Sequence, residues 1–166
     1  MNHKAQAFMP DFMGGILVFS IVITIFIFSW NSVELNQQKF AVEDQIRQDA
    51  YYTTTFLVST KGYPGNWNNS SVDIIGLASD SDNVVSVNKL RELRKISYDR
   101  QKRLLGVRNF NLVFSNQTEV IELDSKDLEY GKKPVNASTV IPLRRNVLID
   151  KPSGSVDAEM RYIVWR

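Results

Sequence analysis

Cysteine is missing from this chain of 166 residues, and histidine occurs once, as His3. Without cysteine the chain can form no disulfide, no zinc–thiolate site and no thiol nucleophile. The position of the single histidine excludes histidine-based acid–base catalysis in the rest of the chain. The net charge of +2 favours no particular class of partner.

Charged side chains are also missing from Phe12 to Val33. About 20 apolar residues form a helix long enough to cross a bilayer. This run is longer than the apolar core of a secretory signal peptide, and no small-x-small cleavage site follows it at Phe28–Asn31. The sequence therefore predicts one helix embedded in membrane lipid. Lys4 and His3 favour a cytoplasmic amino terminus, which places the remainder outside.

The segment before the apolar run reads Lys4-Ala5-Gln6-Ala7-Phe8-Met9-Pro10-Asp11-Phe12. It resembles the class III signal peptide of archaeal type IV pilins and archaellins. That resemblance implies that a prepilin peptidase cuts between Ala5 and Gln6 and leaves the apolar helix on the mature protein. The mature chain would then join other pilin-like subunits on a pilus assembly platform. A simple signal anchor that is never cut is the alternative.

Asp11, Gly14 and Gly15 are the candidate assembly residues. Cleavage would create an α-amino group on Gln6, with which Asp11 of a neighbouring subunit could pair, fixing register more than adding adhesion. In the alternative interpretation, Pro10 starts the helix and Asp11 is an ordinary first-turn acidic residue. Glycine costs a helix about 1 kcal/mol relative to alanine. In membranes, however, small residues let helices approach closely, and they are also common there without any role.

Beyond Val33 the helix is predicted to continue as a stem to about Ala50. An apolar stripe follows helical spacing at Leu35, Val42, Ile46, Ala50 and Leu57. The β-branched and aromatic run 51–58 leaves the end of the helix open. The turn-forming cluster 61–67 then marks the start of a head. The predicted domains are a leader stub (1–5), a transmembrane and stem helix (6–60) and an extracytoplasmic α+β head (61–166).

Within the head, Asn88 is expected to cap a helix that ends at Lys95. Ser97 is expected to cap a second helix, stopped at Gly106. Strands are predicted at 107–114, 118–123, 138–149 and 156–165, and strict alternation over 109–114 indicates a half-buried strand. The predicted fold is α+β: a small antiparallel sheet with two short helices and the stem against it. Trp67 is expected to close a small core; an exposed ligand-stacking role is the alternative.

The head also contains an ordered set of short strings: Gly62 to Trp67, Ile75 to Ala78, Asn88 to Leu90, and Leu104 to Gly106. In this order they resemble archaeal membrane-anchored pilin-like proteins, over most of residues 4–114. The resemblance implies a place in archaeal surface or pilus machinery. It implies no defined chemistry.

A cluster of basic residues lies between the two predicted head helices and within them. Such clusters can bind nucleic acid or anionic surfaces. The interpretation we prefer is two solvated amphipathic helices with Leu90, Leu93, Leu104 and Leu105 packed inward. The cluster would carry the alternative function, a single-pass surface protein that never polymerises and whose head binds a ligand or partner. The candidate binding residues are Arg91, Arg94, Lys95, Arg100, Lys102 and Arg103, and Arg144 with Arg145 forms a second small basic spot.

Four asparagines begin N-glycosylation sequons, all on the presumed outer part: Asn68, Asn69, Asn116 and Asn136. No glycine-rich phosphate loop, metal-spaced His/Cys set or nucleophile–base pair is found in the sequence. We therefore expect no catalytic residue, no metal and no cofactor. Asp80, Asp82 and Asn83 lack the glycine and the closing glutamate of a calcium loop.

Overall fold

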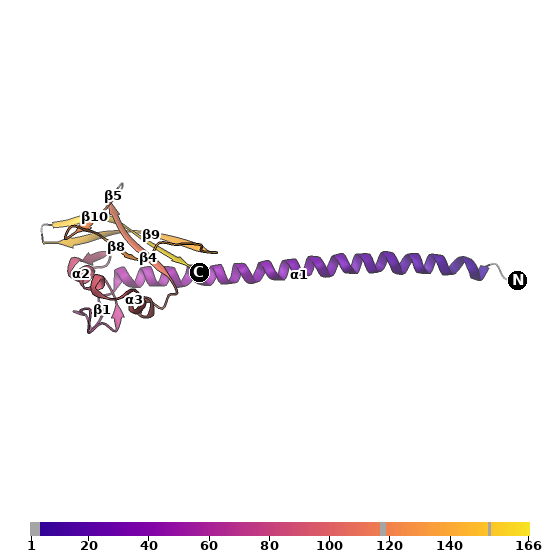
Figure 1. Ribbon diagram of the computed structural model, residues 1–166, viewed down its shortest axis with the longest axis horizontal. Helices are drawn as coiled ribbons and strands as arrows, with labels where there is room; N and C mark the ends of the chain where they lie inside the picture. Colours follow the sequence, from indigo (N-terminus) through magenta and orange to yellow (C-terminus); the bar gives the residue numbers. More distant parts are fainter. Residues whose placement is uncertain (1–3, 117–118, 153) are drawn as a thin grey trace. The chain divides into compact units, whose positions relative to one another are not determined.

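The computed structural model describes residues 4–116, 119–152 and 154–166, with the side chains of 4–11, 35, 36, 38 and 39 excluded from the description. The chain divides into two compact units, Met1–Asp44 and Gln45–Arg166. The boundary lies inside helix α1 (Lys4–Ser59), which Figure 1 shows in full. The second unit contains the strands and two short helices, so the α+β class is confirmed.

Helix α1 begins at Lys4 and runs for 56 residues. Pro10 therefore lies inside the helix, and the first turn contains no acidic residue. The interpretation in which Pro10 starts the helix, with Asp11 in the first turn, is wrong. Proline removes one backbone hydrogen bond from the preceding turn, but the alanines at 5 and 7 are strong helix formers that let the helix begin earlier.

Helix α1 ends at Ser59. The β-branched and aromatic run 51–58, over which the sequence did not decide where the helix ends, is therefore helical throughout. Thr54, Leu57 and Val58 are buried, and Ala50 is 1 % exposed. The hydroxyls of Thr55 and Ser59 donate to the carbonyls four residues earlier, both at 2.8 Å. Packing of this face on the head outweighs the weak helix propensity of the run. The predicted stripe holds at 46, 50 and 57, whereas Val42 is exposed and the side chain of Leu35 lies outside the described residues.

The main sheet of the head has the strand order β3-β9-β10-β4-β5, and β8 pairs with β4 in addition. Its two longest strands, β9 and β10, form an antiparallel hairpin that is paired from Lys151↔Gly154 to Val140↔Trp165. The sheet is mixed and not purely antiparallel as predicted, because β3 runs parallel to β9 over three residues only, Leu148–Asp150. The strands are β3 (Val84–Ser86), β4 (Phe110–Asn116), β5 (Glu119–Val120), β8 (Glu129–Gly131), β9 (Val140–Lys151) and β10 (Gly154–Trp165).

Two further ribbons lie outside the main sheet. Strands β1 (Gly62–Tyr63) and β2 (Ile74–Ile75) form one antiparallel pair, and β6 (Glu122–Leu123) and β7 (Lys126–Asp127) form the other. The predicted strand at 118–123 is thus divided between β5 and β6. These pairs, together with β3 and β8, have too few residues to show a period-2 pattern in the sequence.

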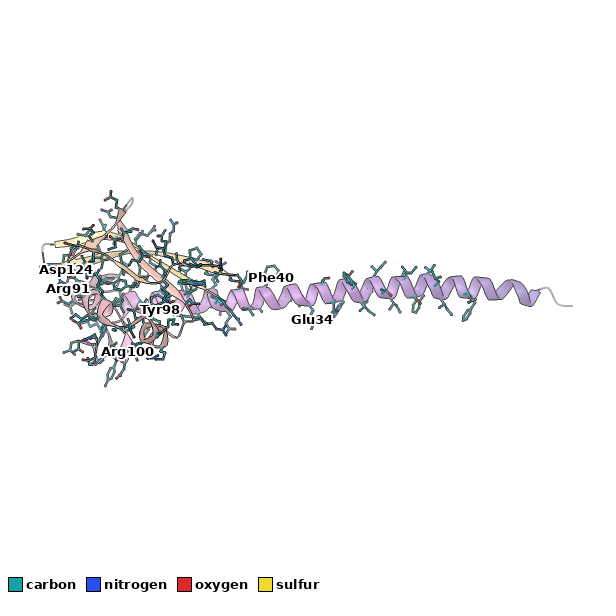
Figure 2. The ribbon with its side chains drawn as sticks, in the orientation of Figure 1. Glu34, Phe40, Arg91, Tyr98, Arg100 and Asp124 are labelled. Atoms are coloured by element: carbon teal, nitrogen blue, oxygen red, sulfur yellow. The ribbon has the colours of Figure 1, made fainter. Side chains whose placement is uncertain are left out.

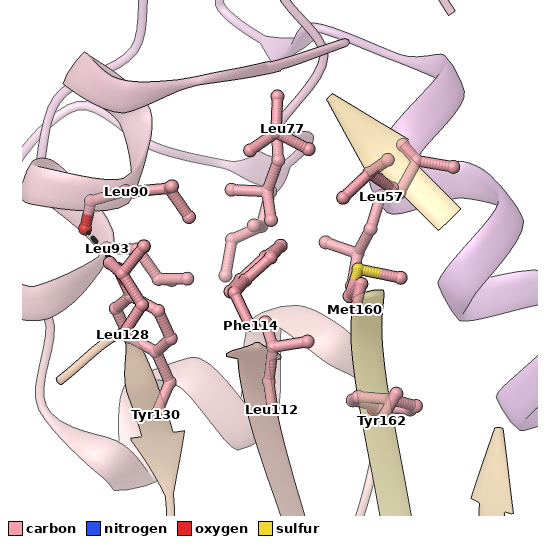
Figure 3. Close-up of a cluster of buried hydrophobic side chains, with 14 of the residues drawn as sticks. Leu57, Leu77, Leu90, Leu93, Leu112, Phe114, Leu128, Tyr130, Met160 and Tyr162 are labelled. Atoms are coloured by element: carbon pink, nitrogen blue, oxygen red, sulfur yellow. Dashed lines mark hydrogen bonds between the residues drawn. The ribbon is translucent and has the colours of Figure 1, made fainter. Parts of the chain in front are cut away.

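The core of the head lies between one face of the sheet and the helices. Figure 3 shows Leu112 and Phe114 of β4 beside Met160 and Tyr162 of β10, with Leu57 of α1 across from them. The prediction of a half-buried β4 is wrong, because residues 110–114 are buried on both faces. β4 is a central strand between β10 and β8, and on its second face the Asn111 Nδ2 donates to Glu129 Oε1 at 2.9 Å.

Helix α2 (Val87–Lys95) follows β3 directly, so its N-cap residue is Ser86 and not Asn88 as predicted. Pairing of β3 with β9 fixes where the chain turns from strand to helix. Helix α3 (Tyr98–Leu105) has Ser97 at its N-cap and Gly106, with φ 67°, at its C-cap, as predicted. Glycine takes this left-handed conformation without the steric cost of a Cβ.

A tight crossing follows the end of α1, where β1 and β2 pair. The Trp67 side chain is 3 % exposed and its indole Nε1 donates to Gly76 O at 2.9 Å, which confirms its predicted place in the core. A Cβ on Gly76 would overlap the Gly62 nitrogen and the Thr60 carbonyl oxygen. Gly76 therefore permits a backbone approach that no other residue type allows.

Candidate functional site

The apolar segment Phe12–Glu34 is the most distinctive surface of the chain. It is 23 residues long, has a mean hydropathy of 2.5 and has no residue buried within the protein. A soluble protein rarely leaves so large an apolar surface uncovered. The segment is long and apolar enough to cross a membrane.

Three of the four hydroxyl side chains of this segment, those of Ser20, Thr24 and Ser32, have hydrogen-bond partners within the helix itself. Ser20 donates to Ile16 O and Thr24 to Ser20 O, both at 2.8 Å, and Ser32 donates to Phe28 O at 3.0 Å. Polar groups in a bilayer must find partners inside the protein, because no water is available there. The segment therefore presents its apolar atoms outward and satisfies three of its four hydroxyls internally.

The predicted leader and assembly residues lie at the start of α1. Ala5, Gln6 and Asp11 are in the helix, but their side chains lie outside the described residues. Beside Gly14 and Gly15 there is open space, with no atom within 4 Å of an added Cβ. No contact within the described chain therefore requires glycine at these two positions.

Two of the candidate basic residues hold the β6–β7 ribbon against α2. The Arg91 guanidinium donates to both Asp124 carboxylate oxygens, at 2.8 and 3.0 Å. The hydrogen bond from Arg91 holds the pKa of the Asp124 carboxyl below its ordinary value. Arg94 donates to the carbonyls of Leu123, at 3.1 Å, and Asp127, at 3.0 Å. Both guanidinium groups thus make contacts that stabilise the fold.

The remaining candidates make a mixture of contacts. Arg100 donates to the carbonyls of Asn69 and Val72 at 2.8 and 3.2 Å, and so fixes that loop to α3. Lys95 pairs with Glu92, and Lys102 with Asp99 at 3.1 Å. Arg103 is exposed. Figure 2 places Arg91, Arg100 and Tyr98 among the side chains of the head.

The two arginines of the second basic spot face opposite sides of the sheet. Arg145 is half-buried against α1, where its guanidinium donates to the Thr54 and Thr55 hydroxyls and lies 4.9 Å from the Tyr51 ring centre. Arg144 is exposed, and its Nε lies 3.8 Å from Glu159 Oε1. No pattern in the sequence indicated that Arg145 holds the end of α1 against β9.

The sequon asparagines differ in their surroundings. Asn68 is exposed, and its Oδ1 accepts from Ser70 N and Ser71 N, both at 3.0 Å. Asn69 is half-buried, and its N–H donates to Glu92 at 3.0 Å. Asn116 and Asn136 are exposed, although residues 117 and 118 of the Asn116 sequon lie outside the described residues. Burial makes Asn69 the least accessible of the four.

Lys89 was not among the predicted site residues. Its side chain is buried, and its ammonium donates to Lys61 O at 2.6 Å and Ala78 O at 2.8 Å. Burial, assisted by the nearby charge of Lys61, lowers the pKa of Lys89 to about 8, and Asp80 opposes this only partly. Asp80, from the loop compared with a calcium site, instead pairs with Lys61 at 2.8 Å. Among the described residues, no group of three or more His, Cys, Asp or Glu side chains is placed to hold a metal ion.

The low pKa of Lys89 makes the stability of the head depend on pH. Because the folded pKa lies below that of the unfolded chain, the unfolded state binds more protons between about pH 8 and 10.5. The free energy of unfolding should therefore rise with pH across this range, by up to about 3 kcal/mol. Above about pH 10 it should fall again, because burial raises the pKa of Tyr130 and Tyr162.

Chemical denaturation of the full chain in detergent micelles, at several pH values, measures this profile. Lys89→Gln keeps two N–H donors for the two carbonyls but removes the charge, so the rise should disappear. Lys95→Gln removes the same charge from an exposed position and should leave the rise intact. A flat profile in the unmodified chain would contradict the assignment.

Compared with known protein families, curated proteins and solved structures, the chain has no match.

Proposed function

We propose that this chain is a structural subunit of an archaeal type IV pilus-like surface filament, anchored in the membrane before assembly and polymerised through its apolar helix. The observation that carries the proposal is the exposed segment Phe12–Glu34, which is free of charge up to Val33 and satisfies three of its four hydroxyls within the helix. The resemblance of residues 4–12 to a class III signal peptide supports it.

The glycine pair adds a physical argument for helix–helix contact. Two glycines cost an isolated helix about 2 kcal/mol relative to alanine, and open space surrounds both in the single chain. In a membrane or filament core, positions without side chains let a second helix approach closely. Gly14 and Gly15 are therefore suited to contacts between subunits.

Assembly would exchange helix–lipid contacts for helix–helix contacts. Both environments are apolar, so the exchange provides little hydrophobic driving force. Register would then depend on polar pairing, with Asp11 facing the Gln6 α-amino group of a neighbouring subunit. A desolvated carboxylate without that partner is costly, which would disfavour misaligned subunits. An assembly platform would supply the energy for extraction from lipid.

The amino terminus of the mature protein tests this proposal. Mass spectrometry of the chain from its native membrane should find Gln6 at the start, and sheared filaments should contain the same species. Ala5→Leu should block cleavage, because the residue before the cut is small in class III signal peptides. Ala7→Leu makes the same change two residues further on and should still be cut.

Other starting residues would separate the alternatives. A chain that begins at Met1 or Asn2 and is absent from filaments would favour a non-polymerising surface protein. A water-soluble species that begins after Trp30 would overturn both functions.

A further inference from the structure

A hollow of about 370 Å³ lies beside α2 and the tight crossing after α1. Its volume falls within the range of small-molecule sites. Its charged lining residues are Lys61, Asp80, Lys89 and Glu92, and the neutral side chains that can hydrogen-bond a ligand include those of Asn66, Asn88, Ser79 and Ser86. The hollow therefore places the Lys89 side chain beside neutral amides and hydroxyls and beside two carboxylates.

Lys89 is the unusual member of this set. The residue is 9 % exposed, yet no carboxylate lies within ion-pair distance of its ammonium among the described residues. A buried charge without a counter-charge is unfavourable, and buried lysines are ordinarily paired. An ammonium has three N–H donors, and the two described bonds, to Lys61 O and Ala78 O, use two of them.

The acidic residues around the hollow already have partners. Asp80 pairs with Lys61 at 2.8 Å. Glu92 pairs with Lys95 and also accepts a hydrogen bond from the Asn69 N–H at 3.0 Å. Each of these two pairs is neutral, although Lys95 itself lies outside the lining of the hollow. Lys89 is therefore the one charged side chain of the lining that has no ion-pair partner among the described residues.

We propose that this hollow binds a carboxylate group, which pairs with the free N–H of the Lys89 ammonium and accepts hydrogen bonds from the neighbouring amides. The carboxylate belongs either to a free small molecule or to an acidic side chain of another protein. This site does not depend on filament assembly, because every group that forms it lies within one chain. Binding supplies the counter-charge that the fold leaves out.

Proton uptake is the signature of such binding. An opposite charge in contact with an ammonium favours its protonated form. Because burial holds the pKa of Lys89 at about 8, a bound carboxylate should raise it by about one unit or more. The carbon-13 chemical shift of Lys89 Cε, followed against pH, reports that pKa directly.

The experiment titrates the full chain in detergent micelles with sodium acetate, and with sodium chloride at equal ionic strength. Acetate should shift the Lys89 resonance in a saturable manner and raise its pKa, whereas chloride should not. Lys89→Gln retains donors for both carbonyls and should weaken acetate binding by about tenfold or more, measured at the Asn66 and Asn88 amide signals. Lys95→Gln, an exposed charge of the same sign, should change it less than about twofold.

A capped peptide, acetyl-Gly-Asp-Gly-amide, separates the two sources. Binding about tenfold tighter than acetate indicates an acidic side chain of a partner, and equal or weaker binding indicates a free small carboxylate. Three results would overturn the proposal: no saturable shift with either probe, the same shift with chloride, or equal loss in both lysine variants.

Discussion

Gly76→Ala is expected to unfold Gln45–Arg166, while leaving the helical signal of the apolar segment in place. The added Cβ would overlap the Gly62 nitrogen and the Thr60 carbonyl oxygen, which are backbone atoms and cannot turn aside. Overpacking at a buried crossing, with loss of the Trp67 hydrogen bond to Gly76 O, should cost about 4 kcal/mol or more. That is a large share of the roughly 5–15 kcal/mol that stabilises a domain.

Gly65→Ala is the matched control for this substitution. An added Cβ at Gly65 meets no atom within 4 Å. Its only general effect is on the entropy of the unfolded chain, a change of about 1 kcal/mol or less. Denaturant midpoints of the full chain in detergent, followed by tryptophan fluorescence, measure both variants. Equal midpoints for Gly76→Ala and Gly65→Ala would show that the crossing is not as tight as described.

If the apolar segment anchors the chain in a membrane, as we propose, charges placed within it should release the chain. Val22 and Ile25 are exposed near the middle of Phe12–Glu34. An arginine at the centre of a membrane helix makes insertion less favourable by about 2.5–3.5 kcal/mol. The double variant Val22→Arg/Ile25→Arg should therefore lose about 6 kcal/mol, enough to reduce membrane retention by well over tenfold.

A second double variant controls for net charge. Ser81 and Ser155 are exposed residues of the head, and arginines there add the same two charges in water. Extraction of membranes with alkaline carbonate should leave the Ser81→Arg/Ser155→Arg chain in the pellet and release the Val22→Arg/Ile25→Arg chain. If both double variants stayed in the pellet to the same extent, the segment would not be what holds this protein in the membrane.

Features that depend on neighbours in the sequence were predictable. The charge-free run to Val33 and the pair of Ser97 and Gly106 around α3 are local signals, and both agree with the structure. Strands β9 and β10 were also found, each within about two residues of its ends, because long alternating runs are strong signals.

Features that depend on distant residues were not predictable. The start of α2 at Val87 follows from the pairing of β3 with β9, about 60 residues along the chain. Burial of Asn111 on the second face of β4 requires β8, a strand of three residues with no pattern of its own. The local rules for caps and alternation were therefore overruled by pairing in the sheet.

The candidate site shows the same division. A basic cluster was visible in the sequence, but not that Arg91, Arg94 and Arg100 would hold loops more than 20 residues away. Lys89 lies in the same basic stretch of the sequence, and nothing there distinguishes it from a solvated lysine. Lys89 is buried because the fold brings the carbonyls of residues 61 and 78 to its ammonium. No spacing along the chain indicates this contact.

Strand β3 pairs with only a short part of β9, and this affects how a second molecule could approach that edge of the sheet. On that side of β9, no strand pairs with residues 140–147 among the described parts of the chain, so an extended peptide from another molecule could add there. Leu148 N donates toward β3, to Asn83 O at 2.8 Å, and alternation along a strand turns the nitrogen of Pro142 to the same side. Proline has no hydrogen to donate. Pro142 therefore interrupts the hydrogen-bond ladder that a strand from a second copy would need, which disfavours edge-to-edge joining of two copies along β9.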